Sequence, residues 1–237
     1  FLVVYMVDGK KMSNLNVLYE DNHIIVVLKK ENIPVQEDSS KDIDMLTIIK
    51  SYLKEKYDKK GNVYLGLVHR LDRPVSGVMV FAKTSKAASR LSDEIRTNKF
   101  HKSYLTIVHG KLKNKTGRLI NKLTKDSKTN TSYVDLKNGK ESILEYEVLK
   151  YDKKQDLSLL KINLITGRHH QIRVQMSNNG NPIYGDQRYG FQDKKQIALF
   201  AYKLEFIHPV KKENVVFKCL PKKSGVWKML EGIEEEL

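Results

Sequence analysis

The chain has 237 residues, of which 40% are hydrophobic, so it can bury a full core as one large domain or two small ones. Its 43 Lys and Arg residues against 28 Asp and Glu residues give a net charge of +15. This excess favours a polyanionic partner, nucleic acid before membrane, although a lysine-heavy genome would produce much of the same charge. The single cysteine, Cys219, excludes an internal disulfide and a cysteine-ligated zinc site. No apolar run approaches the ~18 residues of a membrane span, so we expect a soluble, cytoplasmic protein.

Apolar spacing predicts the elements of the first half of the chain. Residues 17–28 are typical of two strands around an Asp-Asn turn, and the apolar positions of residues 45–53 fall at helical spacing. Short apolar runs at 67–68 and 78–82 predict two more strands. After them, Thr84 or Ser85 can cap a helix with Ala88, Leu91 and Ile95 on one face, and residues 101–109 predict a strand.

The segment 99–128 is strongly basic. It holds one acid, Asp126, and nine basic residues: Lys99, Lys102, Lys111, Lys113, Lys115, Arg118, Lys122, Lys125 and Lys128. We expect most of it to be irregular, and the pattern fits a solvated arm and a phosphate-contacting arm equally well.

The second half is dominated by strand patterns. We expect an antiparallel pair at 142–150 and 156–164, further strands at 198–206 and 215–220, and a closing helix at 226–235. Residues 1–16 are expected to be an N-terminal extension or residues left by cloning, not a signal peptide. The whole predicts an α+β fold, with a mixed, mostly antiparallel sheet flanked by helices and loops in a single domain over residues 17–237.

One loop carries the first chemical signal. Between the predicted strands stands His69-Arg70-Leu71-Asp72-Arg73-Pro74-Val75-Ser76-Gly77. Pro74 and Gly77 predict a rigid, sharply turned loop, and the arginines on either side of Asp72 favour its ionised form. A held, ionised carboxylate is suited to act as a nucleophile or a general base. A lone Asp-Arg pair is more often a surface ion pair at a turn, so the loop alone does not decide.

A second signal lies about a hundred residues further on. Residues 166–176 read Thr-Gly-Arg-His-His-Gln-Ile-Arg-Val-Gln-Met, in which Ile172 and Met176 would face the core while Arg168 and Arg173 point elsewhere. A loop at 180–190 follows, rich in glycine and tyrosine. Its glycines permit close approach of a ligand and its tyrosines offer stacking faces for unpaired bases, although an irregular connector would look the same.

Together these stretches resemble the signatures of the RluA-type family of RNA pseudouridine synthases. The resemblance rests on the His-Arg-Leu-Asp loop, Thr-Gly-Arg-x-His-Gln-Ile-Arg, Gly-x-Pro-Ile-x-Gly-Asp-x-x-Tyr-Gly, Lys102-Ser103-Tyr104, and residues 204–209, all in the family's order. It extends from about residue 17 to about residue 220. It implies the pseudouridine synthase catalytic fold, and an isomerase that converts a uridine of ribosomal or transfer RNA to pseudouridine.

The resemblance also implies roles for single residues. Asp72 would attack the target nucleotide after the base is flipped out. Tyr104 would stack on that base and assist proton transfer, and Arg173 would pair with Asp72. Further RNA contacts are implied for Arg70, Arg73, Arg168, His170 and Gln171.

No metal or cofactor is expected, because the reaction involves no redox change or energy input, and the histidines form no metal-binding pair. Relatives often have Asn-Lys-Pro where this chain has Leu28-Lys29-Lys30, and many carry His where it has Gln175. An N-terminal S4 RNA-binding domain, common among relatives, is not expected, and the family favours a monomer.

Parts of the sequence also suggest two other functions. A catalytically silent RNA-binding module on the same fold would not require Asp72, Tyr104 and Arg173 together. A phosphotransferase, suggested by the likeness of His-Arg-Leu-Asp to a kinase loop, is excluded because the sequence has neither a Gly-rich phosphate loop nor an Asp-Phe-Gly motif.

Overall fold

The computed structural model describes residues 6–7, 10–11 and 15–237. The chain divides into two compact units. Unit 1 comprises residues up to Phe100 and Lys203–Cys219, and unit 2 comprises His101–Tyr202 and Leu220–Leu237. The expected N-terminal extension, residues 1–16, lies largely outside the described residues.

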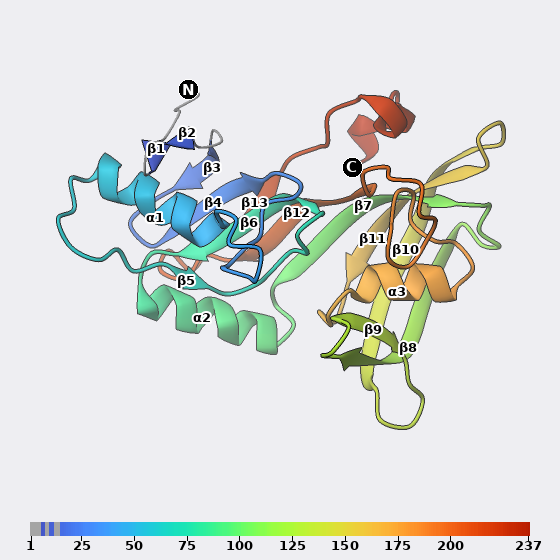
Figure 1. Cartoon of the computed structure of the whole chain (residues 1–237), viewed down its shortest axis with the longest axis horizontal. Coiled ribbons are helices and arrows are strands. Elements are labelled where there is room, and N and C mark those ends of the chain that lie inside the picture. Colours follow the sequence, from blue (N-terminus) through green and yellow to red (C-terminus); the bar gives the residue numbers. More distant parts are fainter. Residues whose placement is uncertain (1–5, 8–9, 12–14) are drawn as a thin grey trace. The chain divides into compact units, whose positions relative to one another are not determined.

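Unit 1 is built on a small sheet (Figure 1). Its strands are β3 (Asn16–Glu20), β4 (Ile24–Lys29), β5 (Gly66–Leu67), β6 (Ser76–Ala82) and β13 (Asn214–Lys218), together with the second half of β12 (Leu199–Ile207). The order is β3-β4-β6-β12, with β5 beside β6 and β13 beside β12. A separate two-stranded ribbon joins β1 (Met6–Val7) to β2 (Lys10–Lys11).

Two helices complete unit 1, and both begin at side-chain caps. Asp44 accepts the Thr47 amide at the start of α1 (Met45–Lys56), and Thr84 accepts the Ala87 amide at the start of α2 (Ser85–Arg96). The α2 residues Ala87 and Leu91 pack on one sheet face with Ile24, Val26, Val78 and Val80. Because side chains alternate along a strand, Ile25, Val27 and then Lys29 belong to the opposite face.

Unit 2 is a mostly antiparallel sheet with one α-helix. Its strands are β7 (His101–His109), β8 (Thr116–Asp126), β9 (Thr131–Val134), β10 (Lys140–Asp152) and β11 (Leu157–Leu164), with the first half of β12. The order is β12-β7-β11-β10-β8-β9. The helix α3 (Gln171–Asn178) contacts β8 and β9, and two short 3-10 helices, η1 (Gly225–Leu230) and η2 (Glu234–Glu236), end the chain.

The predicted α+β class with a mixed, mostly antiparallel sheet is confirmed. Two local predictions are wrong. Most of the basic segment is regular: residues 116–126 form β8, whose alternation is disguised because apolar Ile120 shares the exposed face with Arg118 and Lys122. The closing helix is replaced by η1 and η2, because Gly232 between them takes a φ of +84°, which breaks an α-helix.

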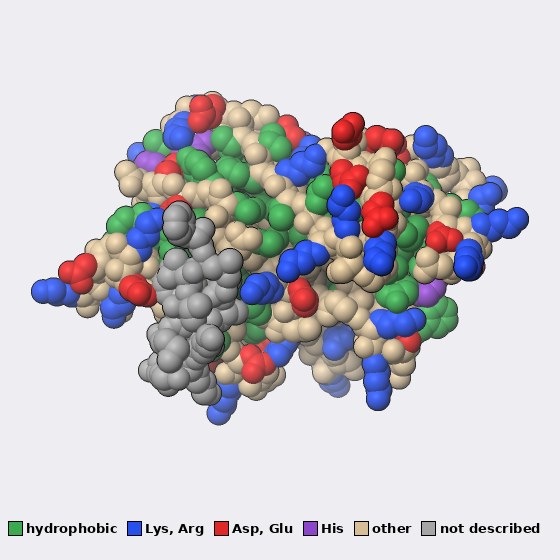
Figure 2. Space-filling model, turned by 90° about the horizontal axis from the view of Figure 1, so that it is seen from above, with side chains coloured by type: hydrophobic (Ala, Val, Ile, Leu, Met, Phe, Trp, Pro, Cys, Tyr) green, Lys and Arg blue, Asp and Glu red, His purple; other side chains and the backbone are tan. Residues whose placement is uncertain are grey.

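The charge is dispersed over the visible surface. Figure 2 shows lysine and arginine side chains spread over one face of the molecule, with aspartate and glutamate among them. Among the described residues, no helix has the length and apolar character needed to cross a bilayer.

Candidate active site

The Asp72 loop, residues 69–77, connects β5 to β6 in unit 1. A reverse turn closes it, in which the Val75 amide donates to the Asp72 carbonyl at 3.0 Å. Leu71 and Val75 are buried on either side of the turn, while Asp72 keeps partial exposure. Gly77, the second residue of β6, has a φ of +141°, a conformation that favours glycine. The loop is therefore held at both ends and presents Asp72 between them.

His69 fastens the beginning of this loop to β6. Its Nε2 accepts the Val80 amide at 3.1 Å, and its ring packs against Phe100 with ring centroids 5.5 Å apart. Because Nε2 accepts, the neutral ring carries its proton on Nδ1.

Lys29, the last residue of β4, fastens the end of the loop. Its side chain is fully buried, and its ammonium donates to the carbonyls of Val75 at 2.7 Å, Arg73 at 2.9 Å and Lys30 at 3.0 Å. Burial lowers the pKa of Lys29 to about 7, and the charge of Asp72 opposes that shift.

The two arginines of the loop differ. Arg70 is exposed. The Arg73 guanidinium donates to Ser40 Oγ at 2.7 Å and to the Asp42 carboxylate, with Asp38 3.6 Å away. The hydrogen bond from Arg73 is the main cause that lowers the pKa of Asp42. An acidic stretch just before α1 therefore covers Arg73.

In unit 2, Tyr104 and Arg173 are both buried. Tyr104 lies within β7, opposite Ile162 of β11. Arg173 was expected to point away from the core, yet its side chain is only 6% exposed. Its Nε and Nη2 donate to the two carboxylate oxygens of Asp186 at 2.8 and 2.7 Å, a bidentate pair.

The Asp186 carboxylate organises the loop that follows α3. Its Oδ1 also accepts the amides of Arg188 and Tyr189 at 3.0 and 3.2 Å. Burial raises the pKa of Asp186, but the Arg173 guanidinium and these amides outweigh it and the net pKa is lowered. Gly185, just before it, has a φ of +73°, and a Cβ there would meet the Gln196 carbonyl at 2.2 Å.

Tyr189 connects this pair to the start of α3. Its ring lies over the Arg173 guanidinium, 5.1 Å from the ring centroid. Its hydroxyl accepts the Ser132 amide at 2.7 Å and lies 2.7 Å from His170 Nδ1. The backbone of His170 is left-handed, with a φ of +53°.

Arg168 lies in the turn before α3, and Gln171 is the first residue of that helix. Gln171 Oε1 accepts from the Thr166 hydroxyl and the Arg168 amide, and its Nε2 donates to Ile143 O and to Gln175 Oε1. These four bonds use the full capacity of the amide, so Gln171 shapes the turn. Arg168 is exposed, and its Nε donates to the Glu141 carbonyl.

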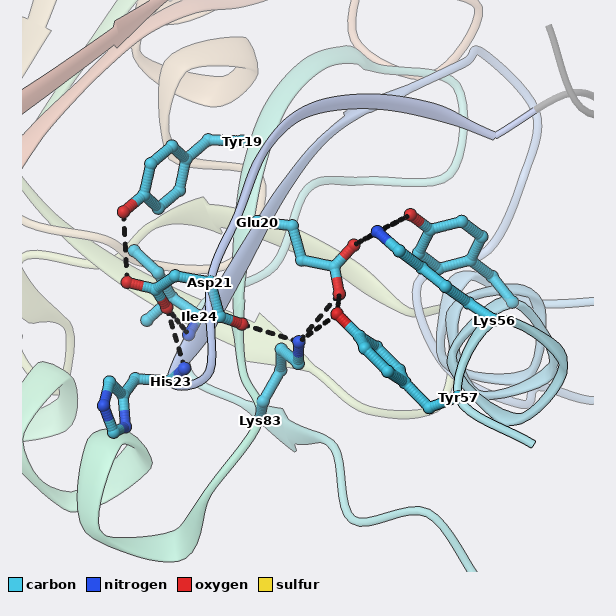
Figure 3. A network of polar contacts seen from close by, with 9 residues as sticks. Tyr19, Glu20, Asp21, His23, Ile24, Lys56, Tyr57 and Lys83 are labelled. Atoms are coloured by element: carbon cyan, nitrogen blue, oxygen red, sulfur yellow. Dashed lines mark hydrogen bonds and ion pairs between the residues drawn. The ribbon is translucent and has the colours of Figure 1, made fainter. Parts of the chain in front are cut away.

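A second polar cluster of unit 1, the Glu20 network, lies at the β3–β4 turn (Figure 3). The Glu20 carboxylate accepts hydrogen bonds from Lys56, Tyr52, Tyr57 and Lys83, at 2.7 to 2.8 Å. Burial raises the pKa of Glu20, but these four donors outweigh it and lower the pKa to about 2. The network joins α1 to β3 and to the end of β6.

Within their own units, the expected residues fall into two groups. Asp72, Arg70 and Arg73 share the loop of unit 1, while Tyr104, Arg168, His170, Gln171 and Arg173 belong to unit 2. Sequence reasoning did not assign Lys29 or Asp186. Asp186 stood in the glycine-rich motif and could have been found there. Lys29 matches the lysine of the Asn-Lys-Pro pattern of relatives, which could have marked it. Among the described residues, no group of three or more His, Cys, Asp or Glu side chains could hold a metal.

Comparisons with known proteins agree with this sequence pattern. Residues 23–178 match the RNA pseudouridylate synthase family model. An uncharacterized RNA pseudouridine synthase of Aquifex aeolicus is 34% identical over 216 residues, which cover 86% of this chain and 68% of that protein. The ribosomal large subunit pseudouridine synthase C of Buchnera aphidicola subsp. Baizongia pistaciae is 33% identical over 220 residues, covering 86% and 66%.

Solved structures agree on the fold. Human RNA pseudouridylate synthase domain containing 1 superposes with a TM-score of 0.71 at 23% identity, covering 89% of this chain and 84% of that one. The family match spans both the Asp72 loop and α3. The chain therefore belongs to the RluA-type family of RNA pseudouridine synthases and is an isomerase.

Proposed function

We propose that this protein isomerises a specific uridine of ribosomal or transfer RNA and that Asp72 is its nucleophile. The observation that carries the proposal is the presentation of Asp72: a partly exposed carboxylate on a loop whose neighbours, Leu71 and Val75, are buried. The loop is bonded to the sheet through His69 and Lys29. A carboxylate held in this way is ready to attack without reorganisation.

The reaction fits a single carboxylate. The C1′–N1 bond of uridine breaks, the uracil turns, and a C1′–C5 bond forms while the proton of C5 is lost and N1 gains one. Atoms and electrons balance within the nucleotide. Asp72 supplies an oxygen nucleophile, either to C1′ or to C6 of the base, and is released at the end.

Tyr104 and Arg173 are proposed to act with Asp72 on the same nucleotide. The uridine must leave its stack, which costs a few kcal/mol, and a tyrosine face recovers about 1–3 kcal/mol by stacking. The fork of Arg173 suits a carboxylate better than a lysine would. Two of its five N–H groups serve Asp186, and we assign others to Asp72 during the reaction.

The remaining contacts concern RNA binding. Arg70 and Arg168 are exposed cations suited to phosphates, and Arg73 becomes available when RNA displaces Asp42. His170 contacts the nucleotide, and Gln171 acts through the turn that it shapes. Ribosomal RNA is the first substrate to test, because two similar proteins from Buchnera aphidicola are named ribosomal large subunit pseudouridine synthases. We propose that the protein acts as a monomer, which light scattering checks.

The experiment measures tritium release from RNA labelled at uridine C5, taken from cells that lack the enzyme. It compares the wild type with Asp72→Asn and with Asp58→Asn, a control at an exposed aspartate of the same unit. We expect release by the wild type and the control, and none by Asp72→Asn, which still binds RNA. Turnover by Asp72→Asn would refute the role of Asp72. RNA binding without release by any of the three would favour a silent binding module.

A further inference from the structure

The loop that follows α3 carries an exposed ring, Phe191, to which the proposed reaction gives no role. This residue is 55% exposed. The tyrosines of the loop were expected to offer stacking faces, but both are engaged within unit 2. Tyr189 lies over the Arg173 guanidinium, and Tyr184 stacks on His109 with ring centroids 5.7 Å apart and planes 21° apart. Phe191 is therefore the ring of this loop that is presented to solvent.

The ring of Phe191 rests on a fixed support. It meets the His109 ring at 85°, with centroids 4.8 Å apart, and His109 in turn lies against Tyr184. A perpendicular contact occupies at most one face of a ring, so a face of Phe191 remains for another aromatic system. The Tyr184 amide donates to the Ile107 carbonyl at 2.9 Å, and its carbonyl accepts the Ala198 amide at 2.8 Å. This aromatic cluster is thereby anchored to the sheet of unit 2.

One glutamine shapes the turn from which Phe191 projects. Gln187 Nε2 donates to the Asp193 carboxylate at 3.1 Å and to the Lys195 carbonyl at 3.0 Å. Its Oε1 accepts the Lys194 amide at 2.9 Å, and the Asp193 amide donates to the Phe191 carbonyl at 2.9 Å. Because the turn is already hydrogen-bonded, Phe191 loses little conformational freedom when a ligand covers it.

Positive charge accompanies the exposed ring. Segment 187–196 holds three basic residues against one acid, Asp193. The Lys195 ammonium lies 4.8 Å from the Tyr184 ring centroid and 3.0 Å from the Asp193 carboxylate. Lys194, beside it, is exposed as well. An aromatic face next to surplus positive charge suits single-stranded RNA, whose bases stack and whose phosphates are anionic.

We propose that Phe191 is a stacking site for an unpaired base of the RNA substrate other than the target uridine, with Lys194 and Lys195 contacting the adjoining phosphates. The proposal rests on the proposed action on RNA and adds a contact to a nucleotide that does not react. Stacking is tolerant of base identity, because every base has a π-face. The site therefore positions RNA by its unpaired nucleotides and not by its base sequence.

A protein partner fits this surface less well. Protein interfaces are depleted of charge at their core, and they are marked by contiguous apolar patches. In segment 187–196, the exposed residues other than the phenylalanine are all polar or charged: Gln187, Arg188, Gln192, Lys194, Lys195 and Gln196. Phe191 is thus a single ring among polar neighbours, which favours a nucleobase as its occupant.

The first test measures the binding of an oligoadenylate of about eight nucleotides, which has no uridine and cannot react. It compares the wild type, Phe191→Ala and Leu136→Ala, a control that truncates an exposed apolar side chain of the same unit. We expect Phe191→Ala to bind about fivefold more weakly or worse, the lower limit for removing an aromatic face from a stacked base. The control should match the wild type, and equal affinities of wild type and Phe191→Ala overturn the proposal.

An abasic ribose-phosphate oligomer of the same length separates stacking from charge. It keeps the phosphates and lacks the bases, so the wild type and Phe191→Ala should bind it alike. An equal loss of affinity for both oligomers overturns the stacking role. So does a change of oligomeric state in Phe191→Ala with an unchanged affinity for oligoadenylate, because the ring would then belong to a protein interface.

Phe191→Trp reports the contact directly when it is combined with Trp227→Phe, which removes the single natural tryptophan. A base stacked on an indole quenches its fluorescence. We expect quenching by oligoadenylate and none by the abasic oligomer. Unquenched fluorescence at an oligoadenylate concentration that saturates binding overturns the proposal.

Single-turnover tritium release separates binding from chemistry. Phe191→Ala should need about fivefold more RNA to reach half of its maximal rate. Its rate constant at saturating RNA should stay within about twofold of the wild type, because the ring touches a nucleotide that does not react. A half-saturating RNA concentration equal to that of the wild type overturns the proposal.

The outcomes separate this inference from the proposed function. If Asp72→Asn retains turnover, the role of Asp72 fails, whereas the binding of oligoadenylate still decides the role of Phe191. If Asp72→Asn is inactive while Phe191→Ala binds RNA as the wild type does, only the inference about Phe191 fails.

Discussion

Unit 1 buries a cation, Lys29, under the Asp72 loop, and unit 2 buries a cation, Arg173, that is itself proposed for catalysis. The two cations are neutralised in different ways. In unit 1, the Lys29 ammonium meets three backbone carbonyls. In unit 2, the Arg173 guanidinium meets the carboxylate of Asp186 through two parallel hydrogen bonds. Carbonyls bring only dipoles, whereas a carboxylate brings a full opposite charge.

This difference determines what each cation can do. Lys29 holds backbone, and its lowered pKa lets it lose its proton near neutral pH. Arg173 holds a side chain, and an arginine side chain is not deprotonated in proteins under ordinary conditions. The charge of Lys29 therefore changes with pH near neutrality, whereas the charge of Arg173 does not.

The largest expected effect on stability comes from breaking the ion pair of Arg173 and Asp186. Asp186→Ala leaves Arg173 buried without its carboxylate, which we expect to lower the free energy of unfolding by about 3–5 kcal/mol. Urea denaturation measures it, with Glu141→Ala as a control at an exposed acid of the same unit. A loss no larger than that of the control would show that the bidentate pair does not stabilise unit 2.

The Glu20 network tests whether unit 1 also depends on charge pairing. Glu20→Gln keeps the shape but removes the charge that four donors share, and we expect a loss of about 1.5–3 kcal/mol in the free energy of unfolding. Glu55→Gln, on the exposed side of α1, is the matched control. Because the pKa of Glu20 is lowered to about 2, this stability is present above the ordinary value of 4.5 and disappears as the pH falls toward 2.

Lys29 and Asp186 should each make the free energy of unfolding depend on pH, Lys29 in the alkaline range and Asp186 in the acidic range. Between about pH 7 and 10.5 the unfolded chain protonates Lys29 more than the folded chain does, so stability rises with pH, by at most about 1.4 kcal/mol per pH unit. Asp186, whose pKa is lowered from 3.8, stabilises above that value, and this contribution is lost as the pH falls through its folded pKa. Unfolding curves of Lys29→Met should lack the alkaline rise, and an unchanged rise would contradict the assignment.

The smallest effect on stability is expected at Arg73, whose ion pairs are exposed. Arg73→Ala should change the free energy of unfolding by less than about 1 kcal/mol. It should nevertheless weaken RNA binding and reduce the salt dependence of the binding constant by about one counterion. Asp42→Asn should do the reverse and tighten binding. Filter-binding titrations at several salt concentrations measure both, and equal affinities in all three proteins would exclude Arg73 from the RNA contact.

Much of the fold could be predicted from local pattern. The strands at 101–109 and 142–150 and the helix capped by Thr84 have clear periodicity and caps, and the structure contains them. The closing helix predicted at 226–235 is wrong because the apolar spacing suggests a continuous helix, whereas Gly232 takes a left-handed backbone that separates η1 from η2. The strand β8 was missed because apolar Ile120 stands on its exposed face and polar Asn121 on the other, so the apolar alternation of the sequence is weak.

The motifs of the candidate site could be predicted from the sequence, but the groups that hold their side chains and backbone in place could not. The Asp72 loop was found from its residue types and order, because proline, glycine and flanking charge act locally. The partner of Arg173 lies 13 positions away in another motif, and two of the three acceptors of Lys29 lie 44 and 46 positions away. Backbone carbonyls occur at every residue, so no sequence pattern identifies which of them a buried ammonium will choose.

The pairing of Lys29 with Gly77 also limits how the Asp72 loop could be reused in protein engineering. A graft of residues 69–77 onto another scaffold would carry the proposed nucleophile but not the Lys29 ammonium that donates hydrogen bonds to its turn. The smallest portable module includes β4 and β6 in register, with lysine at the end of one and glycine opposite. The geometry of the Asp72 loop therefore depends on both β4 and β6, and both strands would have to be transferred with it.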